Sequence, residues 1–282
     1  MNVISIPMLA ALLLLLANCG AQAAGNKSKA AAPTVQKKES TPKDEFQLLQ
    51  KAAARGDAEA QYNLGWMYSK GEGVLKDASK SFEWFQKAAA QGHAGAQFIL
   101  GVMYAKGDGT SKNVAKTIEW FQKAASQGHA EAQFFLGVMH TYGEGVPKDT
   151  AKAMEWYQKA ATQGHTEAQY NLGWMYSNGE GVRKDTAKTF EWFQKAAAQQ
   201  HAEAQYNLGV MYRDGEGVTK DVAKAIEWLQ KAAAQQHADA RYTLGLMYRD
   251  GEGVTKDTIK AIEWFQKAAS QGHKKAQFIL NM

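Results

Sequence analysis

The sequence predicts an all-α solenoid of 36-residue helix-turn-helix repeats, and three observations carry this prediction. The chain matches itself without a gap when it is shifted by 36 residues, each period contains two amphipathic segments, and helix-capping residues recur at a constant place. A fixed period of this length is typical of helix-pair arrays. A single helix pair cannot bury its apolar face, so neighbouring pairs must stack to complete a core.

The first helix of each repeat, helix A, is predicted over residues 58–70 in the first full repeat. Ala60, Leu64 and Met67 follow one another at spacings of four and three residues, which places them on one face of a helix. A glycine follows the leucine position in every full repeat, as Gly65 does here. The missing side chain would let a neighbouring helix pack against the backbone.

The second helix, helix B, is predicted over residues 78–91, with Phe82 and Phe85 on its apolar side. The residue before each helix B is an aspartate or asparagine that serves as its N-cap: Asp77, Asn113, Asp149, Asp185, Asp221 and Asp257. Gly92 follows helix B at a place where φ is usually positive. Gln200 and Gln236 replace this glycine in two repeats, which should cost some local stability.

Each end of the array is predicted to be half a repeat. A helix B over residues 43–55 begins it and a helix A over residues 274–282 ends it, so the chain contains seven helices of each kind. Six full repeats cover about 58–273, and the whole solenoid covers 43–282. Lys274 and Lys275 on the last helix suit a face exposed to solvent.

The N-terminal residues 1–23 are predicted to be a signal peptide. Residues 3–17 are an apolar run that is shorter than the roughly 20 residues needed to span a bilayer, although no lysine or arginine precedes it. Residues 16–19 resemble a lipobox that would leave a lipid on Cys19, whereas Ala21 and Ala23 fit ordinary signal cleavage. We favour lipidation, because the one cysteine stands at the required place. Residues 24–42 read as a flexible linker.

This segment predicts an exported protein, either in the periplasm or as an outer-membrane lipoprotein, with secretion as a further outcome. A membrane contact is expected only through Cys19. The net charge is +5, but residues 1–43 hold five lysines and one glutamate, which leaves about +1 for the repeats. A nucleic-acid-binding protein concentrates positive charge on its folded part, so no nucleic-acid partner is expected.

The fourth full repeat shows the sequence pattern most completely. It contains the run from Ala168 to Tyr176, the loop from Gly179 to Asp185 and the segment from Trp192 to Ala198. These residues resemble the Sel1-like repeat family, a relative of the tetratricopeptide repeats, and the resemblance covers residues 44–282. It implies a right-handed α/α superhelix that mediates protein contacts, and secreted bacterial members are linked to host interaction and envelope processes. A cysteine-rich subgroup is associated with β-lactamase activity, but this chain lacks its paired cysteines.

Repeated polar residues invite catalytic or metal-binding interpretations that their context disfavours. The Gly-x-Gly loop at 71–77 follows a helix rather than a strand and lacks the Gly-Lys-Ser/Thr ending of a phosphate loop. Histidines recur at one position of the period: His93, His129, His165, His201, His237 and His273. Asp57 holds the same place in the first repeat, which indicates that they cap helix A. The periodic carboxylates show no local break, so no catalytic residue, cofactor or metal is expected.

Two positions on helix A are candidates for binding a partner. The first holds an aromatic residue in each full repeat: Tyr62, Phe98, Phe134, Tyr170, Tyr206 and Tyr242. The second, one turn later on the same stripe, alternates between large and small side chains: Trp66, Val102, Val138, Trp174, Val210 and Leu246. The first position is equally consistent with packing between repeats. The second position is predicted to be partly exposed, because a tightly packed core would not accept such a change in side-chain volume between repeats.

Arg213 and Arg249 add charge at one end of this stripe, where earlier repeats have Ser69, Ala105 and Thr141. An aromatic face with a charged end suits a peptide or protein segment. The sequence therefore predicts a non-enzymatic protein-interaction scaffold, exported to the cell envelope, that binds a partner on a concave helix-A face. Two alternatives stay open: a cell-wall hydrolase of the β-lactamase type and a glycan-binding scaffold, since tryptophan and tyrosine also stack on sugars.

Overall fold

The structure, a computed structural model, describes residues 41–281. The predicted signal peptide at 1–23, Cys19 and nearly all of the linker lie outside the described residues. The chain divides into two compact units at Lys148 and Asp149, and each unit is described by itself. Within residues 41–281 all regular secondary structure is helical.

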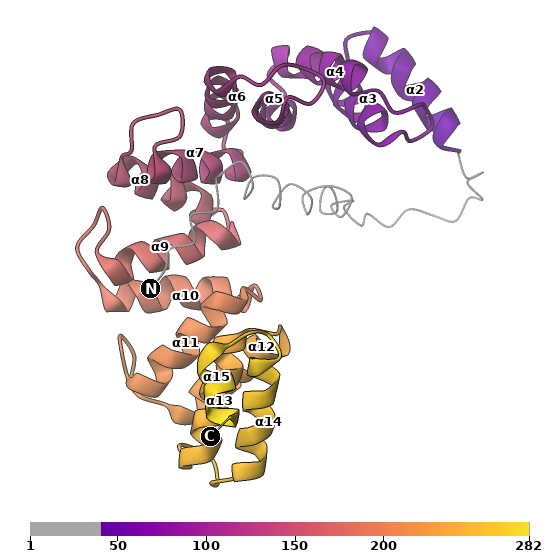
Figure 1. Cartoon of the computed structure of the whole chain (residues 1–282). Helices are drawn as coiled ribbons and strands as arrows, with labels where there is room; N and C mark the ends of the chain where they lie inside the picture. The colour runs from indigo at the N-terminus through magenta and orange to yellow at the C-terminus, as the bar shows by residue number, and fades with distance from the viewer. Residues whose placement is uncertain (1–40, 282) are drawn as a thin grey trace, which may run out of the picture. The chain divides into compact units, whose positions relative to one another are not determined.

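Helices of the two predicted kinds alternate along the chain (Figure 1). The A helices are α3 (Ala58–Lys70), α5 (Ala94–Lys106), α7 (Ala130–Tyr142), α9 (Thr166–Asn178), α11 (Ala202–Asp214), α13 (Ala238–Asp250) and α15 (Lys274–Leu280). The B helices are α2 (Pro42–Ala54), α4 (Ala78–Ala90), α6 (Val114–Ser126), α8 (Thr150–Thr162), α10 (Thr186–Ala198), α12 (Val222–Ala234) and α14 (Thr258–Ala269). The fourteen helices of the described residues are the six full helix pairs and the two terminal half repeats that the 36-residue period predicts.

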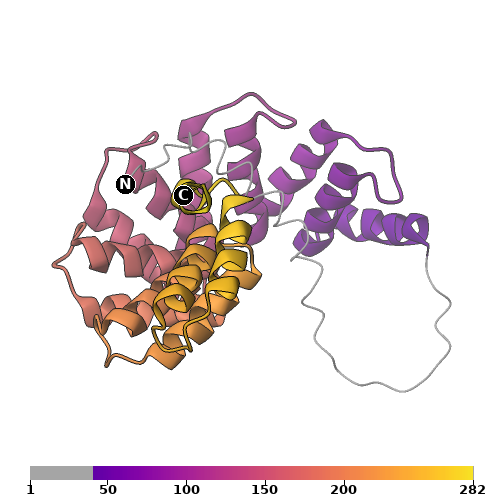
Figure 2. The ribbon, with the colours of Figure 1, turned by 60° about the horizontal axis from the view of Figure 1, so that its bottom comes forward.

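Successive helices pack on one another within each unit, from α2 to α7 and from α8 to α15. The orange and yellow helices α11–α15 stack side by side in the view of Figure 2. This arrangement of tandem helix pairs is an α/α solenoid, which confirms the predicted fold class.

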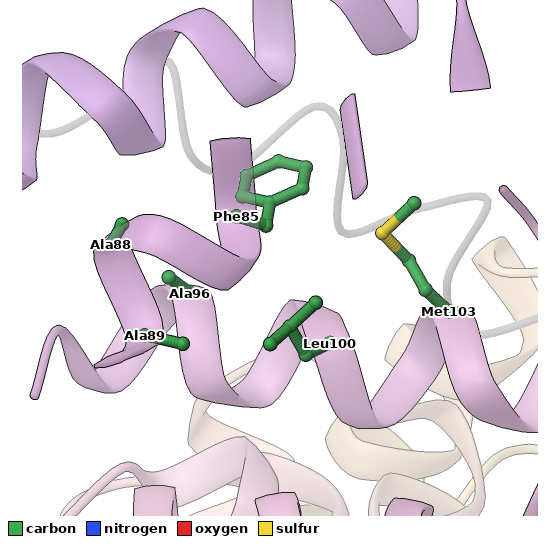
Figure 3. Packing of buried hydrophobic residues seen from close by; sticks show 6 residues of the cluster. All are labelled: Phe85, Ala88, Ala89, Ala96, Leu100 and Met103. Carbon is green, nitrogen blue, oxygen red and sulfur yellow. The ribbon is translucent and has the colours of Figure 1, made fainter. Parts of the chain in front are cut away.

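The hydrophobic core lies at the junctions between repeats. At the junction between α4 and α5 the buried side chains are Phe85, Ala88 and Ala89 of α4 and Ala96, Leu100 and Met103 of α5 (Figure 3). Full burial of a side chain such as Phe85 or Leu100 contributes about 1.5–3 kcal/mol. Because the two helices belong to consecutive repeats, this stabilisation is available only when both repeats are folded.

The recurring glycine of helix A makes room for an aromatic ring. A Cβ atom added to Gly65 would lie 2.7 Å from ring atoms of Phe85, and one added to Gly245 would lie 2.5 Å from Phe265. The expectation that a neighbouring helix packs against this backbone is therefore confirmed. The group that packs there is the ring of helix B in the same repeat.

The recurring glutamine of helix A joins three helices by hydrogen bonds. Gln97, buried on α5, donates from Nε2 to the carbonyl of Ala89 in α4 at 3.2 Å. Its Oε1 accepts from Nε2 of Gln127, the C-cap of α6, at 2.7 Å. Arg241 replaces this glutamine in α13 and donates to the carbonyls of Ala233 and Lys267. A buried amide is costly unless it is paired, and here both of its ends are used.

The predicted helix bounds hold to within two residues, and the first helix differs for an identifiable reason. It begins at Pro42, which the sequence analysis placed in the linker, rather than at Lys43. Thr41 and Asp44 form a capping box, with each side chain accepting from the other residue's backbone N–H. Proline is well suited to the first helical position. At the other end, Asn281 caps α15 after Leu280.

Gln200 and Gln236 adopt the left-handed conformation that glycine occupies elsewhere, with φ of 67° and 66°. Their equivalent Gly92 has φ of 88°, and nothing lies within 4 Å of a Cβ added there. The cost of a side chain at this position is therefore conformational, as expected from the sequence.

The change Gln200→Gly should raise the free energy of unfolding by about 0.5–1 kcal/mol. The left-handed penalty of roughly 1–2 kcal/mol disappears, and the greater backbone entropy of unfolded glycine offsets part of the gain. Urea unfolding followed by circular dichroism measures the change. The reciprocal variant Gly92→Gln should lose a similar amount. An unchanged or lower stability of Gln200→Gly would show that this conformation carries no strain.

Candidate partner-binding surface

The histidine before each helix A, from α5 to α15, is its N-cap, as predicted. The backbone N–H of Ala96 donates to Nδ1 of His93 at 3.1 Å, and that of Ala204 donates to Nδ1 of His201 at the same distance. Asp57 caps α3 in the same way through its carboxylate. The remaining histidine, His140, is half-buried on α7, with Nδ1 3.4 Å from the carbonyl oxygen of Pro147.

Capping histidines also contact the preceding A helix, which the sequence did not indicate. The ring of His93 stacks on Tyr62 with 4.4 Å between centroids, and its Nε2 lies 3.0 Å from a carboxylate oxygen of Glu59. His273 repeats both contacts with Tyr242 and Asp239. The partners stand 31 and 34 residues before the histidine, so only the stacking of repeats brings them together.

The first candidate position therefore takes part in packing between repeats. Tyr170 and Tyr206 stack on His201 and His237, at centroid distances of 4.5 and 4.8 Å. These two tyrosines remain half-buried, as do Tyr62 and Tyr242. Burial, with the charge of Glu203 adding to it, raises the pKa of Tyr170 to about 12. Its hydroxyl is consequently a neutral hydrogen-bond donor on this face.

Phe98 and Phe134 differ from the tyrosines, because they are only 4% and 5% exposed. Phe98 stacks on His129, and it also stacks on Phe135 with 5.9 Å between centroids. Phe135 occupies the place where α3, α9 and α11 carry an asparagine. A larger apolar residue on the neighbouring helix thus turns a surface position into a core position.

The second candidate position is partly exposed in five of the six full repeats, as predicted. Trp174 is the most exposed, at 37%, while Trp66, Val138, Val210 and Leu246 are half-buried. Val102 contradicts the prediction, since it is only 6% exposed. Its short side chain lies one turn from Phe98 and one turn from Ala105, both of which are buried on α5.

Trp66 lies among other rings and a cation. Its ring meets Tyr62 and Phe85 edge to face, and Nζ of Lys70 lies 5.5 Å from its centroid. The indole N–H is buried without an aligned hydrogen-bond partner. A buried donor without a partner costs about 1–3 kcal/mol, so this tryptophan is held by apolar contacts.

The arginines predicted at one end of the stripe are paired with their own neighbours. Arg213 donates from Nε and Nη2 to the two carboxylate oxygens of Asp214, at 2.7 and 3.0 Å. Arg249 and Asp250 form the same fork. Each hydrogen-bonded pair lowers the pKa of its aspartate. The end of the stripe is therefore polar but locally neutral, and other N–H groups of each guanidinium stay outside the fork.

The tryptophans of the B helices have a different role from Trp66 and Trp174. Trp84 packs against the junction between α2 and α3, and Nζ of Lys87 lies 4.0 Å from its ring centroid. In each B helix from α6 to α14 the equivalent lysine lies over the tryptophan three residues before it, with Nζ 3.8 to 4.5 Å from the ring centroid. This contact was not predicted from the sequence, although the constant spacing of lysine and tryptophan indicates it.

The described residues contain no group of three or more His, Cys, Asp or Glu side chains that could hold a metal ion. The Gly-x-Gly segments lie between helix A and helix B, as predicted. Among residues 41–281 no helix is both long enough and apolar enough to cross a membrane.

A family model described as Sel1 repeat matches seven consecutive stretches of the chain. They are residues 46–57, 58–93, 94–129, 130–165, 166–201, 202–237 and 238–273. The six longer stretches coincide with the six full repeats predicted from the sequence.

Two solved structures are similar to the chain. The protective antigen c5321 of uropathogenic Escherichia coli strains, which displays an SLR fold, is 33% identical with a TM-score of 0.81 over 96% of this chain. This chain spans only 58% of the length of that structure. A Sel1 repeat protein from Oxalobacter formigenes is 35% identical with a TM-score of 0.70, and the match covers 82% of this chain and 94% of that one. No curated protein matches the chain.

The two kinds of tryptophan should differ in what they contribute to stability. Trp174→Val should change the free energy of unfolding by less than about 1 kcal/mol, because valine fills this position in three other repeats. Trp192→Val, in the same unit, should cost about 2–4 kcal/mol, because Trp192 is a buried residue of α10 that is only 7% exposed. Urea unfolding of both variants measures the difference. Equal losses would place Trp174 in the core.

Proposed function

The chain belongs to the Sel1 repeat family, and we propose that it is a non-enzymatic scaffold that binds a protein or peptide segment on its A helices. Sel1 repeat proteins are generally protein-interaction scaffolds. The residues of the A-helix stripe support a partner that lies along it.

The exposure of Trp174 carries the proposal. A tryptophan that is 37% exposed on a helix face keeps apolar surface in contact with water. Packing does not require it, because Val102, Val138 and Val210 occupy the same place in other repeats. Tryptophan is among the residues that dominate binding energy in protein interfaces.

The surroundings of Trp174 indicate a segment with both apolar and polar groups. Tyr170, one turn earlier on α9, offers a neutral hydroxyl, and the tyrosines of α11 and α13 continue the row. Arg213 and Arg249 offer the guanidinium N–H groups outside their forks. Aromatic anchors bordered by hydrogen-bonding groups are the usual composition of a protein interface.

Partner capture by the variant Trp66→Val plus Trp174→Val tests the proposal. The whole protein carries a photocrosslinker, is expressed in its own cells, and captured proteins are quantified by mass spectrometry. We expect a defined set of proteins with the unaltered chain and at least about a tenfold loss of that set with the variant, the effect of 1.4 kcal/mol of binding energy. Circular dichroism checks that the variant is folded.

Leu75→Ala is the matched control, because Leu75 is exposed on a loop away from the A helices. It should leave capture unchanged. Capture that survives the double variant contradicts the helix-A surface. Binding to a glycan array that the double variant abolishes, with no protein captured, favours a glycan-binding scaffold instead.

We also propose that the protein is exported and anchored through Cys19. The apolar run at 3–17 and the position of the one cysteine support this. The similar E. coli protein is described as a protective antigen, a description that fits a location outside the cytoplasm.

Mass spectrometry of the mature N-terminus tests the anchor. We expect a chain that begins at Cys19 and carries diacylglycerol, with palmitate incorporated during growth. Cys19→Ala should abolish the label, and Asn18→Gly, which brings the motif closer to a lipobox, should retain it. A mature chain that begins at Ala24 without lipid indicates ordinary signal cleavage, and a chain that retains Met1 contradicts export.

A further inference from the structure

His201 and His237 each contact two A helices in the native structure. Nδ1 of His201 accepts from the backbone N–H of Ala204 at 3.1 Å, and Nδ1 of His237 accepts from that of Ala240 at 3.2 Å. A backbone amide can only donate, so Nδ1 must carry a lone pair. The ring of a neutral histidine therefore holds its proton on Nε2.

The other nitrogen faces the preceding repeat. Nε2 of His201 lies 3.3 Å from a carboxylate oxygen of Glu167. Nε2 of His237 lies 3.0 Å from one of Glu203, although these two groups are not aligned for a hydrogen bond. One neutral imidazole thus caps its own helix A and contacts the helix A before it.

We propose that protonation of these rings breaks the caps, so that acid weakens the contact between consecutive repeats. A second proton on the ring must go to Nδ1, where it meets the backbone N–H that Nδ1 accepts in the native structure. The cap is then lost. The positive ring also faces the positive end of the helix dipole, which opposes it.

Charged groups near each ring also act on its protonated form. His201 faces Glu167 and Tyr170 on α9, and the charge of Glu203 on α11 also acts on it. Carboxylates favour a charged ring. However, both carboxylates are well exposed to solvent, and ion pairs in such positions contribute little. Burial raises the pKa of Tyr170, so its ring stays neutral.

His237 has equivalent surroundings, with Glu203 and Tyr206 on α11. The helices before the caps, α10 and α12, contribute backbone carbonyls, which do not titrate. The carbonyl of Ala196 accepts from the backbone N–H of His201, and that of Ala232 accepts from the backbone N–H of His237. The loss of the cap is therefore the largest change on protonation. Acid should loosen the N-termini of α11 and α13, the A helices that carry Tyr206 and Tyr242.

Glu203 does not produce the same pH dependence. Its contact with His237 lowers its pKa below the usual value of about 4.5. A carboxyl whose pKa is lower in the folded state than in the unfolded state stabilises the fold at a pH above its unfolded-state pKa. This stabilisation is lost as the pH falls through the folded-state pKa. Glu203 thus stays ionised throughout pH 8 to 5.5.

A titration of the unaltered protein by nuclear magnetic resonance tests the proposal at the caps themselves. Between pH 8 and 5.5 the amide signals of Ala204 and Ala240 should move with a single-proton curve. Their hydrogen exchange, corrected for the intrinsic rate, should accelerate by about fivefold, which corresponds to the loss of one cap. The amide of Ala60 is the internal control, because Asp57 caps α3 without an imidazole. Equal behaviour of the three amides overturns the proposal.

The variant His201→Asn plus His237→Asn extends the test to the fold. Asparagine already caps α6 as Asn113, and it does not titrate. The urea midpoint of the unaltered chain should fall between pH 8 and 5.5, and the slope should become shallower in the variant. His140→Asn, which changes a histidine that caps no helix, should keep the original slope. A slope that persists in the double variant overturns the proposal, and if the variant does not fold, the amide titration decides.

Discussion

The contact between one repeat and the next is the constraint on which the rest of this structure depends. Phe85 and Leu100 belong to consecutive repeats and are buried against the same junction. The glutamine of helix A and the histidine that caps it cross the same boundary. The buried clusters lie across these boundaries, so the stability of each helix pair depends on its neighbours. Residues that recur every 36 positions are those that each junction needs.

This constraint separates the residues that hold the array together from those that are free to bind. At the junctions, apolar rings and alanines are buried on both kinds of helix, and the glutamines are buried on helix A. The second candidate position of helix A keeps some exposure in five of the six full repeats, and it accepts tryptophan, valine or leucine. Because a tightly packed site would not accept such a range of volumes, this position can differ between repeats without a loss of the fold.

The sequence predicts local features well, because they depend on residues that are close in the chain. The caps at Asp77 and His93, the helix bounds and the strain at Gln200 follow from spacing alone. The stack of His93 on Tyr62 could not be predicted, because it requires the geometry of one repeat on the next. The burial of Phe98 depends on Phe135, in the following repeat. The same position in the period is therefore exposed or buried according to a neighbour that a single-repeat pattern does not contain.

The binding surface and the junctions share residues, and this sharing has a thermodynamic consequence. Tyr170 contacts His201 through one ring face while its side chain remains half-buried on helix A. A partner that covers Tyr170 and Trp174 removes water from a contact that also joins two repeats. Anything that binds the folded state alone stabilises it, so a partner lying across α9 and α11 must strengthen the junction between them. By the same linkage, a junction that is weakened at its cap must hold that partner less tightly.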